Sequence, residues 1–172
     1  MALTLLRHSA LQTKYIDSRI PMTDLPIDPE LFNTQKVTLL MQQKFDFIYS
    51  SDLVRCQQTL EMLGIKKYSI DHRLQEIRFK DDVERLGFNE HENLDVYKQY
   101  FVKEKASWHT YLCDEPPEAF TTRIHSFLED IPHGKEILVC AHAGTLHKIL
   151  ALLGCAKNKI AHLEYIRIDN VI

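Results

Sequence analysis

Basic and imidazole side chains stand at three places where a short apolar run of the sequence gives way to a helix. Arg7 and His8 follow the first run, Arg55 lies about one helical turn beyond the second, and His142 follows the third. In an open parallel sheet, such strand-to-helix junctions lie along one edge, where helix N-termini offer N–H groups to anionic ligands. Two guanidinium groups and two imidazoles at that edge would neutralise a phosphoryl group without a metal ion.

The pattern of apolar residues predicts the elements that would position these side chains. Strands are expected at residues 2–6, 45–49, 68–70, 136–141 and 163–168. Helices are expected at about residues 33–43, from the Ser50-Ser51-Asp52 cap to residue 63, at 117–130, and from the His142-Ala143-Gly144 junction to residue 153. Apolar residues recur there at helical spacing, and glycine or proline follows most of the helix ends. Val37, Leu40 and Met41 are expected to share the buried face of the first helix.

Strands that alternate with helices indicate an α/β fold in which helices cover both faces of a sheet. We therefore expect a three-layer α/β/α sandwich with a mostly parallel central sheet, formed by a single domain over residues 1–172. The length suits one domain, because domains usually contain about 100–200 residues. The least regular segment, at about residues 77–118, is interpreted as a small helical lid.

Composition and charge exclude several classes of protein. Apolar residues make up 45% of the chain and the net charge is −3, so no global positive field favours a nucleic-acid partner. No apolar stretch approaches the ~20 residues of a membrane span, and the N-terminus lacks the charged start of a signal peptide, so we expect a cytoplasmic protein without a membrane partner. No zinc-ligand spacing and no P-loop sequence occurs, so neither a metal nor another cofactor is expected. Free, buried thiols are expected at Cys56, Cys113, Cys140 and Cys155.

Four motifs resemble the histidine phosphatase (phosphoglycerate mutase-like) superfamily, and they occur in the family's order between residues 3 and 144. The motifs are LLRHSA, SSDLVRCQQTLEML, RLQEIRF and VCAHAG. The resemblance implies a phosphoglycerate mutase-like fold in which His8 is the nucleophile that accepts the phosphoryl group. The implied phosphate ligands are Arg7, Arg55 and His142. Glu76 matches the family's proton donor, which would protonate the leaving oxygen and then activate water.

The sequence departs from the family pattern close to these motifs. Ser9 stands where glycine is usual, Ala10 where an acid is common, and Lys14 where asparagine is expected. His142-Ala143-Gly144 takes the place of His-Gly-Gly, and His147 the place of a frequent arginine. Further substrate contacts are expected from Ser9, Lys14, Arg78 and Gly144, although Arg78 on its own is more simply explained as a surface or lid-packing residue.

Hydrolysis of a small phosphorylated metabolite is the activity that this pattern favours. A mutase-type phosphotransferase is an alternative, although family mutases are longer and the expected lid is too small for their enclosed site. A catalytically weak phosphate-binding or scaffold protein is another, motivated by Ser9 and Ala10. Among phosphatases, residues 21–26 are similar to α-ribazole phosphatases, with compact phosphohistidine phosphatases as rivals. The oligomeric state is left open, with a homodimer as one option.

Overall fold

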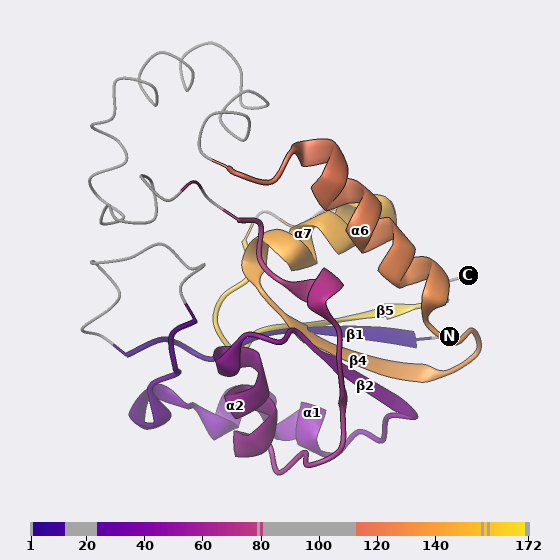
Figure 1. The fold of residues 1–172 in the computed structure, drawn as a ribbon. Coiled ribbons are helices and arrows are strands. Elements are labelled where there is room, and N and C mark those ends of the chain that lie inside the picture. The colour runs from indigo at the N-terminus through magenta and orange to yellow at the C-terminus, as the bar shows by residue number, and fades with distance from the viewer. Residues whose placement is uncertain are drawn as a thin grey trace.

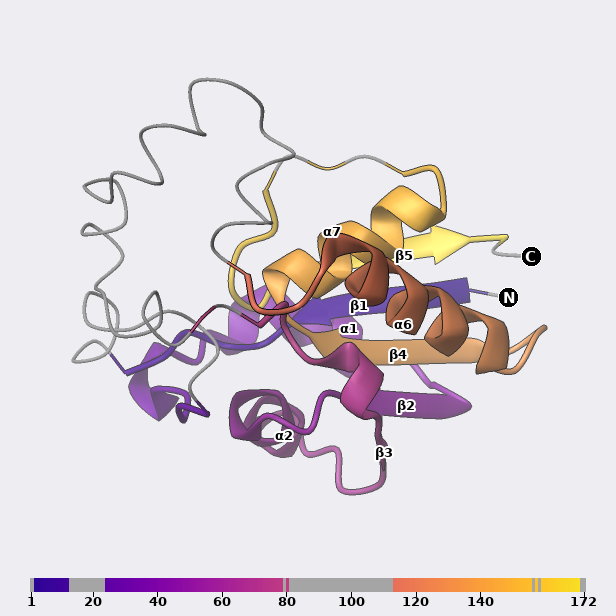
Figure 2. The same cartoon turned by 45° about the horizontal axis from the view of Figure 1, so that its top comes forward.

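The strands form one five-stranded sheet in the order β3-β2-β4-β1-β5, which Figure 2 shows side by side. The computed structural model describes residues 2–12, 24–78, 80, 113–155, 157 and 159–170. The strands are β1 (Ala2–Arg7), β2 (Phe47–Ser50), β3 (Ser69–Ile70), β4 (Glu136–Ala141) and β5 (Tyr165–Asp169). The first four run parallel to one another, whereas β5 pairs antiparallel with β1.

Helices cover both faces of this sheet (Figure 1). α6 (Pro117–Asp130) and α7 (Ala143–Leu152) pack on one face, and α1 (Thr38–Met41) and α2 (Val54–Met62) pack on the other. Alternate residues of β4 point to opposite faces, so Val139 joins the core under α6 and α7, and Cys140 joins the core under α1 and α2. Both faces of the central strands are therefore buried, which explains their continuous apolar sequence. The predicted three-layer α/β/α class with a mostly parallel sheet is confirmed.

The structure places most predicted elements close to their expected positions. β4 and α6 occupy the predicted residues 136–141 and 117–130, and the other strands end within two residues of their predicted limits. The expected lid at residues 77–118 lies outside the described residues except for 77, 78, 80 and 113–118. Of these, residues 117 and 118 begin α6.

The first expected helix, residues 33–43, differs from the prediction. It begins as the 3₁₀ helix η3 (Thr34–Val37) and continues only through α1. A 3₁₀ turn contains three residues, so Val37 and Leu40 lie above one another and both are buried. Met41 is rotated away from them and is 51% exposed, so the expected burial of Met41 is wrong.

The start of α2 is satisfied by a side chain from a distant segment. The expected local cap contributes one bond, because Ser51 Oγ accepts from the Leu53 N–H at 3.3 Å. The first helical residue, Val54, instead donates its N–H to Oδ1 of Asp24 at 2.6 Å. Asp24 therefore satisfies an N–H group that has no partner inside the helix. The helix ends as predicted before Gly64, whose φ of +75° lies in the left-handed region.

The cysteines are free thiols, as expected, but they are not all buried. Cys56, Cys113 and Cys140 are buried, whereas Cys155 is only half-buried because it follows the last turn of α7. No helix in the described part of the chain is both long enough and apolar enough to cross a bilayer.

Candidate active site

The ends of β1 and β4 and the start of α2 meet at one edge of the sheet. The His8 N–H donates to the carbonyl of Ala141 at 3.1 Å, and the Ser51 N–H donates to the carbonyl of Cys140 at 3.0 Å. Arg55, in the first turn of α2, is fully buried behind these bonds. The structure thus brings together the three junctions that the sequence singled out.

The imidazole of His8 is held in one tautomer. Its Nδ1 lies 2.7 Å from the Ser9 carbonyl oxygen. A carbonyl can only accept, so Nδ1 carries the proton and Nε2 carries the lone pair. No hydrogen-bond partner of Nε2 is recorded among the described residues. Burial, followed by the charges of Arg55 and Arg7, lowers the pKa of His8 well below its ordinary value of 6.5. His8 is therefore a neutral imidazole with a nucleophilic nitrogen near pH 7.

The second imidazole, His142, lies beside His8 with a ring-centre separation of 5.1 Å. Arg55 Nε donates to Nδ1 of His142 at 3.1 Å, so Nε2 carries the proton and donates to Ser51 Oγ at 3.0 Å. Burial, followed by the charge of Arg55, lowers the pKa of His142 well below its ordinary value. Both ring nitrogens are occupied, so the recorded contacts give His142 the task of orienting Arg55. Its direct contact with phosphate stays a prediction.

Two guanidinium groups supply positive charge to the site. Arg7 Nη1 donates to the Ile160 carbonyl at 2.7 Å. Burial lowers the pKa of Arg7 and of Arg55, and the nearby Glu76 carboxylate opposes that change in both cases. Arginine remains charged at neutral pH even after such a decrease. A bound dianion would offset the desolvation of these two cations, which suits a phosphate ester.

The Glu76 carboxylate occupies the N-terminus of α7. It is 7% exposed, and it accepts from the Gly144 N–H at 3.0 Å and from the Thr145 N–H at 3.1 Å. Its own loop contributes a third donor, the Ile77 N–H, at 3.1 Å. Helix N-termini attract negative charge, because their first N–H groups have no partner inside the helix. The sheet edge therefore presents an acid next to the two arginines.

Gly144 makes room for this carboxylate. A Cβ atom at this position would lie 3.1 Å from Cδ of Glu76 and closer still to Oε1. The N–H of Gly144 is bonded to Glu76, and the expected substrate contact of Gly144 stays a prediction. The glycine is required here because the carboxylate approaches the helix backbone closely.

Gly144→Ala is expected to displace Glu76 and lower kcat by about 10²-fold, because small misplacements of catalytic groups have effects of that size. Steady-state phosphatase assays would measure it. Ala143→Gly is the matched control, because it changes the adjacent residue by one methyl group without touching the carboxylate. Wild-type turnover by Gly144→Ala would show that the position of Glu76 does not matter.

Arg123 of α6 fixes the loop that carries Glu76. Its Nε and Nη2 form a bidentate pair with the Glu115 carboxylate at 2.6 and 2.8 Å. The same guanidinium donates to the Gln75 carbonyl at 3.0 Å, to the Glu76 carbonyl at 3.3 Å and to the Arg73 carbonyl. An arginine fork that binds three carbonyls of one loop restricts the loop far more than one bond would. Arg123 is therefore a positioning residue for Glu76.

The remaining expected substrate contacts have different outcomes. Ser9 is buried and contributes its backbone, since its carbonyl accepts from His8 and its N–H donates to Thr59 Oγ1 at 2.9 Å. Arg78 is exposed and forms an ion pair with Asp114 at 3.0 Å, with no recorded contact to the residues at the sheet edge. Lys14 lies outside the described residues.

Three side chains at the site were not found from the sequence. Thr59 binds the Ser9 N–H from α2, and its spacing of four residues from Arg55 is a signal that could have revealed it. Arg123 acts through carbonyl groups some fifty positions away, which no local pattern indicates. His162 lies with its ring centre 5.4 Å from that of His8. Its position follows from the antiparallel direction of β5, which brings the preceding loop to the same edge of the sheet as His8.

The buried imidazoles of His8 and His142 and the half-buried imidazole of His162 predict a loss of stability toward acid. Burial is the main cause that lowers the pKa of His8, His142 and His162, the last to about 4. In the unfolded chain these groups titrate near about 6.5, so below that pH the unfolded state binds more protons. The free energy of unfolding should be fully retained above about pH 6.5 and should fall as the pH decreases from there toward the lowered values. Urea unfolding between about pH 7.5 and about pH 5 measures this change, and a constant free energy would contradict it.

The described residues contain no group of three or more His, Cys, Asp or Glu side chains arranged to hold a metal ion. Among the described residues, Arg7 and Arg55 supply positive charge at this edge.

Comparison with known proteins agrees with this arrangement. The family model of the histidine phosphatase superfamily (branch 1) matches residues 3–171. A Hydrogenobacter thermophilus protein provisionally named phosphoserine phosphatase 2 is 32% identical over 167 residues, which cover 88% of this chain and 77% of that protein.

Solved structures share the fold. The Thermus thermophilus protein TTHB049 matches with a TM-score of 0.72 and 24% identity, over 99% of this chain and 94% of its own. A histidine-to-alanine mutant of an Entamoeba histolytica phosphoserine phosphatase, solved with phosphoserine, matches with a TM-score of 0.74 and 22% identity, over 96% and 89%. Mycobacterial glucosyl-3-phosphoglycerate phosphatase matches with a TM-score of 0.74 and 19% identity, over 96% and 88%. The family model spans nearly the whole chain, and the chain therefore belongs to the histidine phosphatase superfamily, branch 1.

Proposed function

We propose that this protein hydrolyses a small phosphomonoester through a phosphohistidine intermediate on Nε2 of His8. The observation that carries the proposal is the state of this imidazole. Its proton is held on Nδ1 by the Ser9 carbonyl at 2.7 Å, and its pKa is lowered by burial and by two arginines. The same arginines that keep His8 neutral would bind the dianionic group that it attacks.

In the first step, the Nε2 lone pair of His8 forms a bond to phosphorus, and the ester P–O bond breaks. The leaving oxygen takes a proton from Glu76. A substrate that binds as its monoanion would give this proton to the Glu76 carboxylate, which leaves the phosphoryl group dianionic when His8 attacks it. The Ser9 carbonyl accepts from Nδ1 while the ring gains positive charge.

In the second step, water attacks phosphorus and transfers a proton to Glu76, and the N–P bond breaks. The phosphate takes this proton from Glu76 as it leaves, so Glu76 returns to a carboxylate and His8 to its neutral tautomer. Arg7 and Arg55 would stabilise the charge on the phosphoryl oxygens in both steps, with His142 holding Arg55 in place. These two cations supply the charge compensation that other phosphatases take from metal ions, which supports a metal-independent reaction.

The replacement of the usual glycine by Ser9 is compatible with catalysis. Ser9 acts through its backbone carbonyl and N–H, and its side chain is buried away from the bonds that orient His8. This observation favours an enzyme over the alternative of a weak phosphate-binding or scaffold protein. The mutase alternative has no comparable support, since the 32% identical relative carries a phosphatase name.

O-phosphoserine is the substrate that we propose to test first, because of the name of that relative. The rival substrate, α-ribazole phosphate, is suggested by the similarity of residues 21–26 to α-ribazole phosphatases. The structure describes residues 24–26 of this segment. Within them, Asp24 has a structural task, since it binds the first N–H of α2. Its presence is thereby explained without reference to a substrate.

The test is phosphate release by EDTA-treated protein from O-phosphoserine, α-ribazole phosphate, 3-phosphoglycerate and p-nitrophenyl phosphate. We expect turnover that EDTA does not remove, with O-phosphoserine the best of the metabolites. A higher kcat/KM for α-ribazole phosphate would change the substrate and keep the mechanism. Isomerisation of 3-phosphoglycerate without phosphate release would establish the mutase. Stabilisation by phosphate without any turnover would establish the binding protein.

A further inference from the structure

The loop before β5 is bonded to the catalytic end of β1. The Leu163 N–H donates to the Arg7 carbonyl at 3.2 Å, and the Arg7 N–H donates to the Glu164 carbonyl at 3.0 Å. The Arg7 side chain adds a third bond through Nη1 to the Ile160 carbonyl. The segment from residue 160 to 164 is therefore fixed relative to the proposed nucleophile.

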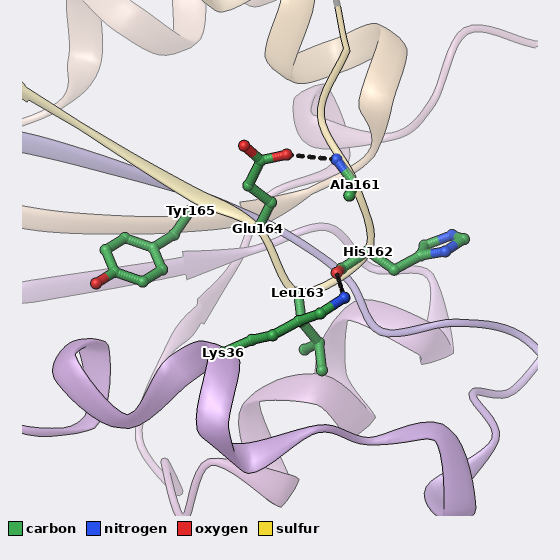
Figure 3. A pocket seen from close by; sticks show the side chains of 6 residues that line it. All are labelled: Lys36, Ala161, His162, Leu163, Glu164 and Tyr165. Carbon is green, nitrogen blue, oxygen red and sulfur yellow. Dashed lines mark hydrogen bonds between the residues drawn. The ribbon is translucent and has the colours of Figure 1, made fainter.

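An unusual backbone conformation turns this loop toward His8. Leu163 has a φ of +59°, in the left-handed region that non-glycine residues seldom adopt, and its side chain is buried under α1 and α2. Such conformations persist where the surrounding contacts fix them, and they concentrate at functional sites. The preceding residue, His162, is directed away from the side chains of Lys36, Leu163 and Tyr165 (Figure 3).

The His162 imidazole contacts the His8 ring, as the His142 imidazole does. Its ring centre lies 5.4 Å from that of His8, and no ring contact between His162 and His142 is recorded in the described part of the chain. A cavity of about 280 Å³ borders the same loop, and its lining includes His162 but none of His8, Arg55 and His142. His162 thus lies between this cavity and the proposed nucleophile, so a substrate group that reaches its ring would lie near the phosphoryl group.

The ring nitrogens of His162 have no recorded hydrogen-bond partner among the residues that the structure describes. The ring is half-buried, and burial followed by the charge of Arg7 lowers its pKa to about 4. Near pH 7 it therefore offers one N–H donor and one acceptor nitrogen to a neighbouring molecule. A polar ring held rigidly beside the nucleophile, with both nitrogens available, is suited to a ligand rather than to the core.

We propose that His162 is a substrate-positioning residue that hydrogen-bonds a carboxylate or hydroxyl group of the substrate, close to the carbon that carries the ester oxygen. This inference rests on the proposed phosphatase function and narrows its substrate class to phosphorylated acids and alcohols with a polar neighbour of the ester. Unsubstituted alkyl phosphates lack the group that His162 binds.

Two substitutions separate this role from simple packing. His162→Phe keeps an aromatic ring against His8 and removes both polar atoms, whereas His162→Gln keeps a donor and an acceptor. His125→Phe is the matched control, because His125 is an exposed residue of α6 paired with Glu129. The measured quantity is the ratio of kcat/KM for O-phosphoserine to kcat/KM for n-propyl phosphate.

We expect His162→Phe to lower this ratio about tenfold, the size of one hydrogen bond to a charged group, through KM more than through kcat. His162→Gln should restore most of it, and His125→Phe should leave it unchanged. An equal loss for both substrates, or no loss, would overturn the inference while the phosphatase function stands. If wild-type protein hydrolyses neither substrate, the proposed function fails. The role of His162 is then tested by calorimetry: His162→Phe should lower the affinity for O-phosphoserine, relative to the affinity for inorganic phosphate, by a similar factor.

Discussion

Replacing His8 with alanine is expected to lower kcat/KM for every phosphomonoester by about 10⁴- to 10⁶-fold, the range found when the nucleophile of a covalent mechanism is removed. The imidazole is the group in the site that combines a free lone pair on Nε2 with a proton fixed on Nδ1. His142 cannot take this role, because its Nδ1 accepts from Arg55 and its Nε2 is bonded to Ser51, so it has no free lone pair.

The same variant should still bind phosphate, because Arg7 and Arg55 remain. An increase in melting temperature with inorganic phosphate, similar to that of the wild type, would show that the site is intact and that only chemistry is lost. His125→Ala is the control for a general effect of removing a histidine, since its exposed ion pair contributes little stability. Substantial turnover by His8→Ala would exclude His8 as the nucleophile.

Glu76→Gln is expected to lower kcat/KM, which reports the transfer of the phosphoryl group to His8, by about 10²- to 10⁴-fold with alkyl phosphates, the usual contribution of general acid–base catalysis. The decrease should be smaller with p-nitrophenyl phosphate, because its leaving group departs as a stable anion and needs no proton. Parallel assays of the two substrate types measure this difference. The same decrease for both types would assign Glu76 a purely structural role.

Glu76→Gln also changes stability, and this effect must be separated from the loss of catalysis. Oε1 and Oε2 of Glu76 accept from the N–H groups of Thr145 and Gly144. A glutamine amide would turn its NH₂ toward one of these donors and leave it without a partner, which costs about 1–3 kcal/mol. Urea unfolding should show this loss, whereas Glu61→Gln, at an exposed position on α2, should show none.

The elements that position the site could be predicted because their sequences carry strong local patterns. β4 is a continuous apolar run, and α6 has apolar residues at helical spacing between Pro117 and Asp130, so both were predicted with their observed limits. The strand ends also indicated which polar residues share the sheet edge. Local patterns of this kind reflect burial on both faces of a strand or on one face of a helix.

Features that depend on distant contacts could not be predicted in this way. Asp24 binds the first N–H of α2 from 30 positions away, and Arg123 binds the carbonyls of residues 73, 75 and 76 from 47 to 50 positions away. The position of His162 depends on the direction of β5 and on the left-handed backbone of Leu163, and apolar periodicity specifies neither. The sequence identifies residues capable of catalysis more readily than the residues that hold them in place.

The measurement that tests the central proposal most directly is isolation of the phosphorylated protein. Wild-type protein would be mixed with ³²P-labelled substrate and quenched in alkali, which preserves a phosphorus–nitrogen bond, and the labelled peptide would then be identified. The account predicts a label that is stable in alkali, lost in acid, carried by the peptide that contains His8, and absent from His8→Ala. An acid-stable label on another residue, or turnover with no covalent label under single-turnover conditions, would contradict it.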